Sequence, residues 1–257
     1  SCRFNDGDTA YMNRTLGTPT NRRIWTLSLW TKRSKLSDEG FIFGADASSG
    51  NSTRDGLRFE SSDELRIFFS GAADGDLKTN AKYRDPSAWM HICVAVDTTQ
   101  STASNRVKIY VNGTQVTSFA TETYPAEDYD ADFNSSSGVH RIGSDLQNTS
   151  NTYNGYMSEF CFVDGQQLTP TSFGEFDSDT PTVFKPIDVS GLTFGDNGAY
   201  LDFEDSDNLG DDESGNTNDW TENNLAAIDQ ASDSPTNNFC TMNPLTTDHH
   251  TFSEGNL

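Results

Sequence analysis

The sequence predicts an all-β protein, an antiparallel β-sandwich of jelly-roll type. Three regions alternate apolar and polar residues with a period of two, the pattern of strands with one face in a core and the other in water. They are residues 24–30, residues 88–97 with 107–113, and residues 139–143 with 153–164. Helical periodicity is nearly absent, and abundant Gly, Asn, Ser, Thr and Asp suit short strands joined by polar turns.

The strands are expected in order along the chain. The first lies at residues 3–5, and the strand of residues 24–32 places Trp25, Leu27 and Leu29 on one face and Thr26, Ser28 and Trp30 on the other. Further strands are expected at residues 41–44, 56–60, 64–70, 89–97, 108–111, 115–119, 139–143 and 155–164. Asn112-Gly113 predicts a type I′ turn, since both positions need positive φ. Residues 121–138 are expected to form an acidic loop.

Charge divides the chain into two parts. Residues 1–141 carry 18 acidic and 16 basic side chains, whereas residues 142–257 carry 21 acidic side chains and Lys185 alone. This balance argues against nucleic-acid binding, which needs clustered Lys and Arg. The acidic residues fit either a solvated surface that keeps the protein soluble or a set of Ca²⁺ ligands. No stretch approaches the roughly 20 apolar residues of a membrane helix, so membrane insertion is not expected.

The length of 257 residues suits one large sandwich, or one sandwich with an extension. Residues 1–178 are expected to form the sandwich. Residues 179–257, which have no long apolar run, are expected to form an irregular acidic extension or linker that leads to a further domain beyond residue 257. Its apolar residues Tyr200, Leu201, Phe203, Trp220 and Phe239 are expected to dock on the sandwich as an edge strand and anchors.

Cysteines and histidines give little sign of chemistry. Cys2, Cys93, Cys161 and Cys240 are far apart and form no CxxC pair, so a zinc site is not expected. With no signal-peptide pattern visible, reduced thiols are favoured. The four histidines do not form a plausible triad, and the two on strands, His91 and His140, are expected to be structural. A Gly-x-Ser-x-Gly nucleophile motif is absent, and the chain is predicted not to be an enzyme.

The order of these motifs resembles the laminin-G-like, concanavalin-A-like sandwich family over residues 2–178. The resemblance rests on Phe4-Asn5-Asp6-Gly7-Asp8, Trp89-x-His91-x-x-Val94-x-Val96, Ile142-Gly143, Asn154-Gly155-Tyr156, Glu159-Phe160-x-Phe162-x-Asp164-Gly165 and the capping turn of residues 168–174. The family uses this fold mostly for binding. It also implies that the first strand pairs near the last, so a Cys2–Cys161 disulfide is the alternative to reduced thiols.

The resemblance also implies candidate sites. Ca²⁺ ligands in the family match Asp6, Asp8 and Asp164, although Thr9-Ala10-Tyr11 stands where an Asp-Asp-Tyr is usual; the alternative is that Asp6-Gly7-Asp8 is simply a turn. Glycan binding needs exposed aromatics and planar amides near loop tips, which are found at Tyr124, Tyr129, Tyr153 and Asn154. The alternative for the aromatics is a place in the core or in a subunit contact.

The C-terminal segments at residues 198–206, 211–220, 233–245 and 253–257 resemble parts of large bacteriophage virion proteins. They imply a non-enzymatic fibre, tail appendage or head decoration, located in the virion and assembled in the host cytoplasm. Its partners would be other virion proteins and host cell-surface polysaccharide, and self-association into a homo-oligomer stays open. The alternatives are a secreted or cell-surface lectin-like module and, more remotely, a glycoside hydrolase. Such hydrolases use Glu-x-Asp-x-(x)-Glu, which Glu175-Phe176-Asp177-Ser178-Asp179 only partly matches.

Overall fold

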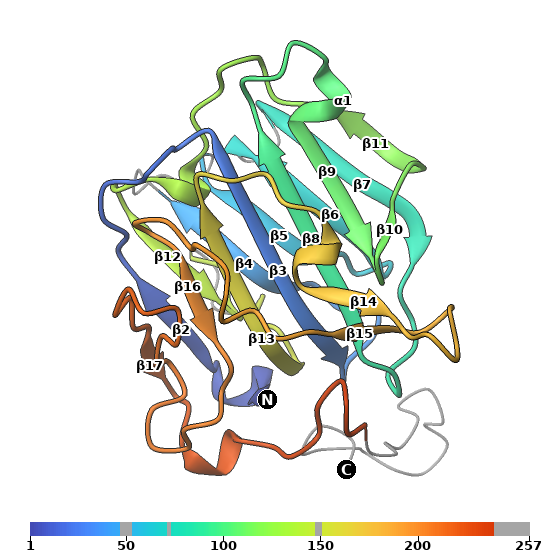
Figure 1. Cartoon of the computed structure of the whole chain (residues 1–257), viewed down its shortest axis with the longest axis vertical. Coiled ribbons are helices and arrows are strands. Elements are labelled where there is room, and N and C mark those ends of the chain that lie inside the picture. Colours follow the sequence, from blue (N-terminus) through green and yellow to red (C-terminus); the bar gives the residue numbers. More distant parts are fainter. Residues whose placement is uncertain (47–52, 71–72, 147–150, 239–257) are drawn as a thin grey trace.

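A computed structural model shows two antiparallel sheets packed face to face (Figure 1). The structure describes residues 1–46, 53–70, 73–146 and 151–238. The predicted all-β sandwich is confirmed: within these residues the one α-helix, α1 (Ala103–Arg106), has four residues. No helix among the described residues is therefore long and apolar enough to cross a bilayer.

The seven-stranded sheet has the order β1-β13-β3-β8-β9-β10, and β16 pairs with β13 beyond the end of β1. Its strands are β1 (Cys2–Phe4), β3 (Ile24–Arg33), β8 (Met90–Asp97), β9 (Val107–Val111), β10 (Thr114–Gln115), β13 (Gly155–Asp164) and β16 (Ala199–Leu201). The long strands β3, β8 and β13 at its centre are those with the clearest alternation in the sequence.

The eight-stranded sheet has the order β11-β7-β6-β5-β4-β12-β2-β17. Its strands are β2 (Tyr11–Arg14), β4 (Gly40–Asp46), β5 (Asp55–Phe59), β6 (Glu64–Phe69), β7 (Gly75–Lys82), β11 (Phe119–Thr123), β12 (Val139–Ile142) and β17 (Thr221–Asn223). A separate hairpin joins β14 (Gly174–Phe176) to β15 (Phe184–Pro186). Single 3₁₀ turns are η1 (Asp6–Asp8), η3 (Asp132–Asn134), η4 (Pro170–Ser172) and η5 (Ala227–Asp229).

The core between the sheets is centred on Phe43 of β4. Its ring lies 5.4 Å from that of Phe133, 5.8 Å from those of Phe160 and Phe162, and 6.1 Å from that of Trp220. All five residues are buried. Tilted and edge-to-face aromatic pairs at these separations add to the stabilisation that burial alone provides. This cluster therefore ties both sheets to a residue far along the chain.

The turn after β9 follows the prediction from Asn112-Gly113. Both residues have positive φ, 47° and 75°, as a type I′ turn requires. Asn is one of the few non-glycine residues that adopt this conformation readily, and the Asn112 side chain also accepts the His91 backbone N–H of the neighbouring strand β8 at 2.8 Å. At Gly113 a Cβ would also come within 2.7 Å of the Phe184 ring, so glycine is needed there for space as well.

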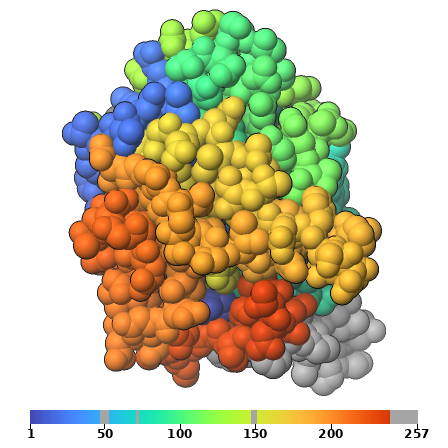
Figure 2. Space-filling view, in the orientation of Figure 1, coloured from blue at the N-terminus to red at the C-terminus, as the bar shows by residue number. Residues whose placement is uncertain are grey.

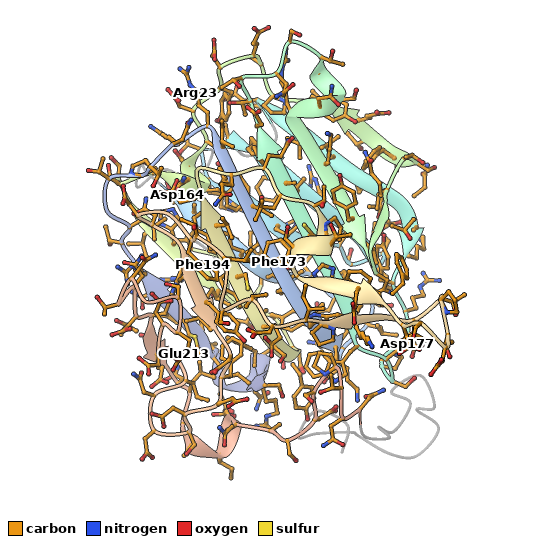
Figure 3. All side chains as sticks on the ribbon, in the orientation of Figure 1. Arg23, Asp164, Phe173, Asp177, Phe194 and Glu213 are labelled. Atoms are coloured by element: carbon orange, nitrogen blue, oxygen red, sulfur yellow. The ribbon has the colours of Figure 1, made fainter. Side chains whose placement is uncertain are left out.

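The outer face of the seven-stranded sheet is buried, which corrects the expectation that one face of each strand meets water. Residues 165–200 run across this face and cover it in Figures 1 and 2. Phe173, Val189 and Phe194 pack on Cys93 and Cys161, and Figure 3 shows the two phenylalanines lying over the sheet. The polar residues of this face are satisfied within the protein; Thr26, for example, donates to the Gln166 carbonyl at 2.7 Å.

The extension belongs to the sandwich, so residue 178 is not the boundary of an independent unit. β16 pairs with Phe160–Phe162 of β13, and β17 extends the eight-stranded sheet beside β2. Leu201, Phe203 and Trp220 lie in the main core, and Tyr200 packs on the outer cluster with Phe194. Docking of these four anchors was predicted and is confirmed, whereas Phe239 lies outside the described residues. The chain then returns to its start, where the Ser1 hydroxyl donates to the Ala231 carbonyl at 3.2 Å.

The strands β2, β7, β11, β14, β15 and β17 were missed from the sequence. β7 buries Leu77 and the polar Thr79, and half of its residues are the polar or charged Asp76, Lys78, Asn80 and Lys82. β11 has no buried residue and lies in part within the expected acidic loop. These strands form because neighbouring strands supply their hydrogen bonds, which a period-two pattern cannot reveal.

We predict that Trp220→Ala lowers the free energy of unfolding by about 3–5 kcal/mol, because it leaves a cavity beside Phe43. Ile228→Ala is the control, since Ile228 also lies in the extension but is 87% exposed, and it should change stability by no more than about 0.5 kcal/mol. Chemical unfolding measures both. Equal small effects would mean that the extension is not part of the cooperative core.

Candidate functional site

A cavity of about 250 Å³ opens at the end of the sandwich where β3 ends and β8 and β13 begin, called here the Arg33 end. Its walls come from the end of β3, the β7–β8 connection, the start of β8 and the β9–β10 turn. The lining residues are Thr31, Arg33, Lys82, Tyr83, Arg84, Asp85, Ala88, Trp89, Met90, Val111 and Asn112. This mixture of aromatic, apolar and hydrogen-bonding groups is typical of small-molecule sites, and the volume is slightly below the ~300–1,000 Å³ of drug-sized pockets.

Asp63 fixes the cationic side of the cavity. This buried residue contacts Arg33 at 3.1 Å and accepts from Arg84 Nε at 2.7 Å, and its carbonyl accepts the Tyr83 N–H at 2.9 Å. Burial alone would raise the pKa of Asp63, but hydrogen bonds from the Ser37 backbone, Arg84 and Arg33 outweigh it and hold the pKa below its ordinary value. The carboxylate thus stays charged and holds both guanidinium groups in place.

Two of the cations remain accessible at the mouth of the cavity. The side chain of Arg84 is 54% exposed and that of Lys82 is 42% exposed, with Glu64 3.3 Å from the Lys82 ammonium. Arg33, in contrast, is buried against the Phe59 ring at 4.3 Å. A ligand in the cavity would therefore meet hydrogen-bond donors from Lys82 and Arg84 and an apolar wall from Tyr83 and Trp89.

Two of the predicted glycan-binding residues lie at this same end. Tyr153 and Asn154 line a second, shallow pocket that shares Arg33 with the first but holds only about 10 Å³, roughly the space of one water. The Tyr153 hydroxyl is buried against Thr31, and Asn154 donates its amide to Asp6. Lys35 also bonds Asp6, at 2.7 Å. These side chains are therefore already paired with one another.

The other two predicted glycan-binding residues lie elsewhere and pack on the main core. Tyr124 follows the edge strand β11, and its hydroxyl donates to Glu122 at 3.0 Å. Tyr129 is partly buried and meets Phe69 edge to face at 6.0 Å. The four predicted residues therefore do not lie together, and all three tyrosines belong to the main core or pack on it, as Tyr153 is buried within it.

The three predicted Ca²⁺ ligands are not brought together. β1 pairs with the start of β13, where Phe4 lies opposite Gly155, so Asp6 and Asp8 lie near the Arg33 end. Asp164 ends β13 nine residues later, roughly 30 Å away at 3.3 Å per residue. Figure 3 shows Asp164 toward the opposite end of the molecule. The calcium set of Asp6, Asp8 and Asp164 is therefore corrected.

Asp164 instead holds loops together. One carboxylate oxygen accepts the Asn21 N–H at 3.1 Å and the Asn134 amide at 2.6 Å, and the other accepts the Thr20 and Asn197 N–H groups at 2.6 and 3.1 Å. Both oxygens thus have two donors each. Within the described residues no three His, Cys, Asp or Glu side chains form a metal-binding group. Binding of Ca²⁺ by the chain stays a prediction.

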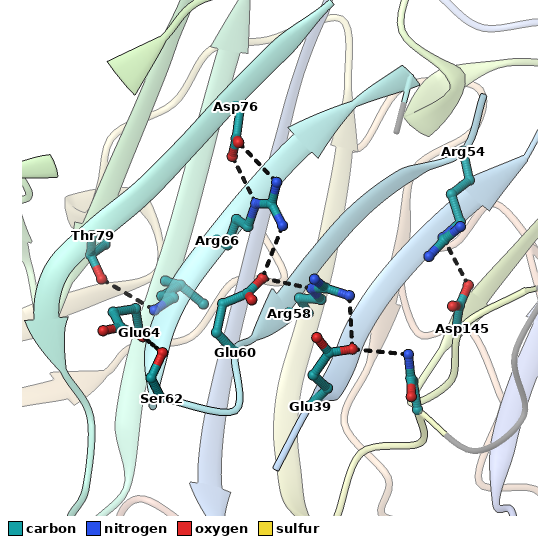
Figure 4. A network of polar contacts seen from close by, with 12 residues as sticks. Glu39, Arg54, Arg58, Glu60, Ser62, Glu64, Arg66, Asp76, Thr79 and Asp145 are labelled. Carbon is teal, nitrogen blue, oxygen red and sulfur yellow. Dashed lines mark hydrogen bonds and ion pairs between the residues drawn. The ribbon is translucent and has the colours of Figure 1, made fainter. Parts of the chain in front are cut away.

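The outer face of the eight-stranded sheet carries a run of linked ion pairs and one separate pair (Figure 4). The run, at 2.7–3.2 Å, is Asp76–Arg66, Arg66–Glu60, Glu60–Arg58 and Arg58–Glu39, and the separate pair is Arg54–Asp145 at 3.1 Å. The guanidinium groups of Arg54, Arg58 and Arg66 also lie within 6 Å of the Phe68 ring. Because these charges already compensate one another, this face is a weaker ligand candidate than the cavity.

The histidines and cysteines that the structure describes are buried, as structural residues are. His91 Nε2 lies 2.8 Å from the Ser28 hydroxyl, and His140 Nε2 lies 2.9 Å from the Asp132 carbonyl. Cys2 faces the main core, whereas Cys161 lies on the opposite face of the same sheet, so the alternative Cys2–Cys161 disulfide is wrong. Cys2, Cys93 and Cys161 are free thiols; Cys240, His249 and His250 lie outside the described residues.

The carboxylates that partly match a hydrolase motif lie away from the cavity. Glu175 and Asp177 are on the β14–β15 hairpin, and each lies 3.4 Å from Lys185. Figure 3 shows Asp177 at the edge of the molecule. They make an exposed charge cluster rather than a pair facing across a substrate site.

Sequence reasoning missed the cavity residues Arg33, Lys82, Tyr83 and Arg84. The available sign was Lys82-Tyr83-Arg84-Asp85-Pro86, a basic and aromatic run in an otherwise acidic chain, directly before the strand that begins near Trp89. The sequence alone could not link Arg33 to this run, because Arg33 and residues 82–86 come together only in the folded sheet, where β3 pairs with β8.

The fold and the motifs agree with a known family. A family model described as the concanavalin A-like lectin/glucanases superfamily matches residues 6–172, more than half of the chain. The chain therefore belongs to this superfamily. A comparison with curated proteins finds no match.

Solved structures of the same fold include binding proteins. A protein from Bacteroides ovatus with a proposed role in carbohydrate binding superposes with a TM-score of 0.53 at 14% identity, covering 83% of this chain and 56% of that one. A heptameric SAP-like pentraxin from Limulus polyphemus gives 0.46 at 16% identity, covering 62% and 71%. Domain 4 of a GH43 extracellular arabinanase from Geobacillus stearothermophilus, in complex with arabinotriose, gives 0.41 at 15% identity, covering 58% and 64%.

We predict that stability falls as the pH drops from about 6.5 toward 4. Burial lowers the pKa of His91 to about 3 and of His140 to about 4. Between pH 6.5 and 4 the unfolded chain, whose histidines have pKa values near 6.5, therefore binds more protons than the folded chain. Each histidine lowers the free energy of unfolding by about 1.4 kcal/mol for each pH unit of this fall. Urea unfolding at pH 7, 5.5 and 4.5 measures the slope. His91→Gln should make it shallower, and an unchanged slope in that variant would contradict the assignment.

Proposed function

We propose that this chain is a non-enzymatic carbohydrate-binding sandwich that serves as a structural or adhesive part of a bacteriophage particle. It would be a fibre, tail appendage or head decoration that packs on other virion proteins and binds polysaccharide of the host surface. The cavity at the Arg33 end is the observation that carries the binding role. The likeness to virion proteins in the C-terminal segments supports the location.

The chemistry of the cavity suits a sugar. A pyranose ring presents an apolar face and a rim of hydroxyl groups, and Tyr83 and Trp89 offer apolar surface while Lys82 and Arg84 offer accessible donors. The volume of about 250 Å³ suits one terminal sugar ring rather than a long oligosaccharide. The Bacteroides ovatus protein that shares this fold has a proposed carbohydrate-binding role, which agrees with this assignment.

The principal alternative is a secreted or cell-surface lectin-like module, which would use the same cavity in another setting. A glycoside hydrolase is the remote alternative, and it would need a carboxylate pair across the bound sugar. Asp85 is the one carboxylate among the cavity residues. Assays for release of sugar from β-glucans test the remote alternative.

We predict that Lys82→Ala and Arg84→Ala each weaken binding to the recognised polysaccharide about tenfold to a hundredfold, because a charged hydrogen bond is worth about 1.5–3 kcal/mol. Binding of the labelled chain to a polysaccharide panel first identifies the ligand. Lys185→Ala is the matched control, since its side chain is 40% exposed, against 42% for Lys82, and lies on the β14–β15 hairpin. It should leave affinity unchanged.

The same panel, run with Ca²⁺ and then with a chelator, tests the calcium prediction, since a Ca²⁺-dependent site would lose binding on chelation. Binding that survives both cavity substitutions would move the site elsewhere on the sandwich. Absence of binding to every polysaccharide would contradict the adhesive role.

Mass spectrometry of purified phage particles tests the virion role independently, and an oxidised pair of thiols in the native protein would favour the secreted alternative.

A further inference from the structure

A buried lysine lies against the segment that follows η5. Lys32, near the end of β3, is covered by residues 231–238, and its side chain and that of Asp233 are each 1% exposed. The Lys32 ammonium lies 2.7 Å from Asp233 Oδ2 and 2.7 Å from Oδ1 of Asn238. A primary amine, a carboxylate and a carboxamide therefore meet at one point.

The residues around Lys32 and Asp233 are aromatic and buried. Trp30, Trp89, Tyr156 and Phe184 form one buried cluster on this part of the sheet, with Ala231 packed against it. The Trp89 indole donates to the other oxygen of Asp233 at 2.8 Å. A charged pair is costly to bury in such a place unless hydrogen bonds compensate it, and here both partners are hydrogen-bonded.

The amide of Asn238 is held at both ends. Its oxygen accepts from Lys32, and its nitrogen donates to the Ser87 carbonyl at 2.9 Å. This arrangement keeps the carbonyl carbon of the amide beside the amine, and fixed proximity of two reacting groups replaces much of the entropy cost of a reaction. A lysine without solvation in an apolar site is also an activated nucleophile.

We propose that Lys32 and Asn238 form an intramolecular isopeptide bond, with Asp233 as the proton carrier. Asp233 takes a proton from the Lys32 ammonium, and the freed amine attacks the carbonyl carbon of Asn238. A bond forms between Lys32 Nζ and this carbon, Asp233 passes its proton to the amide nitrogen, and the bond from the carbon to that nitrogen breaks. Asp233 then accepts the second proton that Nζ loses on becoming an amide nitrogen. Ammonia leaves, no group is oxidised or reduced, and no cofactor is needed.

Such a bond would join β3 to a segment 206 residues later in the chain. It would tie the segment that covers Lys32 permanently to the sandwich. This inference does not depend on the proposed glycan binding or on the proposed virion role, because it concerns only groups that the fold brings together.

The mass of the intact chain of 257 residues tests the proposal. Loss of ammonia makes the protein about 17 Da lighter than its sequence. Digestion with trypsin and a protease that cleaves before Asp should then give residues 24–33 joined to residues 233–247, with no cleavage after Lys32. The full sequence mass would overturn the proposal. A loss of ammonia without the joined peptide, or a Lys32–Asp233 link formed with loss of water, would also overturn it.

Variants separate the reaction from folding. Asn238→Ala and Lys32→Arg should both have the full sequence mass, and Asp233→Asn should accumulate the lighter form more slowly or not at all. Asn238 is exposed as a residue, so its substitution leaves a folded protein even if Lys32→Arg does not. Asn237→Ala is the matched control, because Asn237 is also exposed and bonds only within its own segment. It should keep the lighter mass.

Discussion

The aromatic cluster around Phe43 is the contact on which the rest of the structure depends. Phe43 comes from the eight-stranded sheet, Phe160 and Phe162 come from the seven-stranded sheet, and Trp220 comes from the extension. Because the three parts share one buried centre, none has a complete core without the others. The cavity at the Arg33 end depends on this indirectly, since its walls are the ends of strands that the cluster holds in register.

A second consequence of the extension is that the seven-stranded sheet is covered on both faces. Strands in such a position usually read as continuous apolar runs, yet β3 keeps Thr26 and Ser28 on its outer face. The Thr26 hydroxyl donates to the Gln166 carbonyl and accepts the Leu168 N–H at 2.8 Å, whereas Ser28 bonds His91 within the sheet. The layer formed by residues 165–200 is therefore held by the polar contacts of Thr26 as well as by Phe173, Phe184 and Phe194.

The strands that could be predicted are those whose side chains alone encode burial. The sequences of β3, β8 and β13 alternate clearly, and the Asn112-Gly113 turn is predictable because these two residue types adopt positive φ. β7 and β11 are largely polar strands, and no local pattern marks them, although β7 pairs with β6, the strand directly before it. Alternation also cannot distinguish a strand face in water from one covered by another part of the chain. Trp30 was therefore expected on an open face, although Phe184 packs on it.

For the site, sequence resemblance gave residue types but not distances. Asp6 and Asn154 do meet, because β1 pairs with the start of β13, whereas Asp164 lies at the other end of that strand. One side of the cavity depends on Asp63, which contacts both Arg33 and Arg84. To predict that arrangement one must know which strands are neighbours, and the sequence does not state it.

The contact between Ser1 and Ala231 joins residues 230 positions apart in the chain. It closes a loop that contains most of the described residues, and the entropy cost of closing a loop rises with its length. The contact is therefore expected to form only once the strands between the two residues are already paired. A fold that depends on such distant contacts is expected to form slowly compared with a helical protein of the same size.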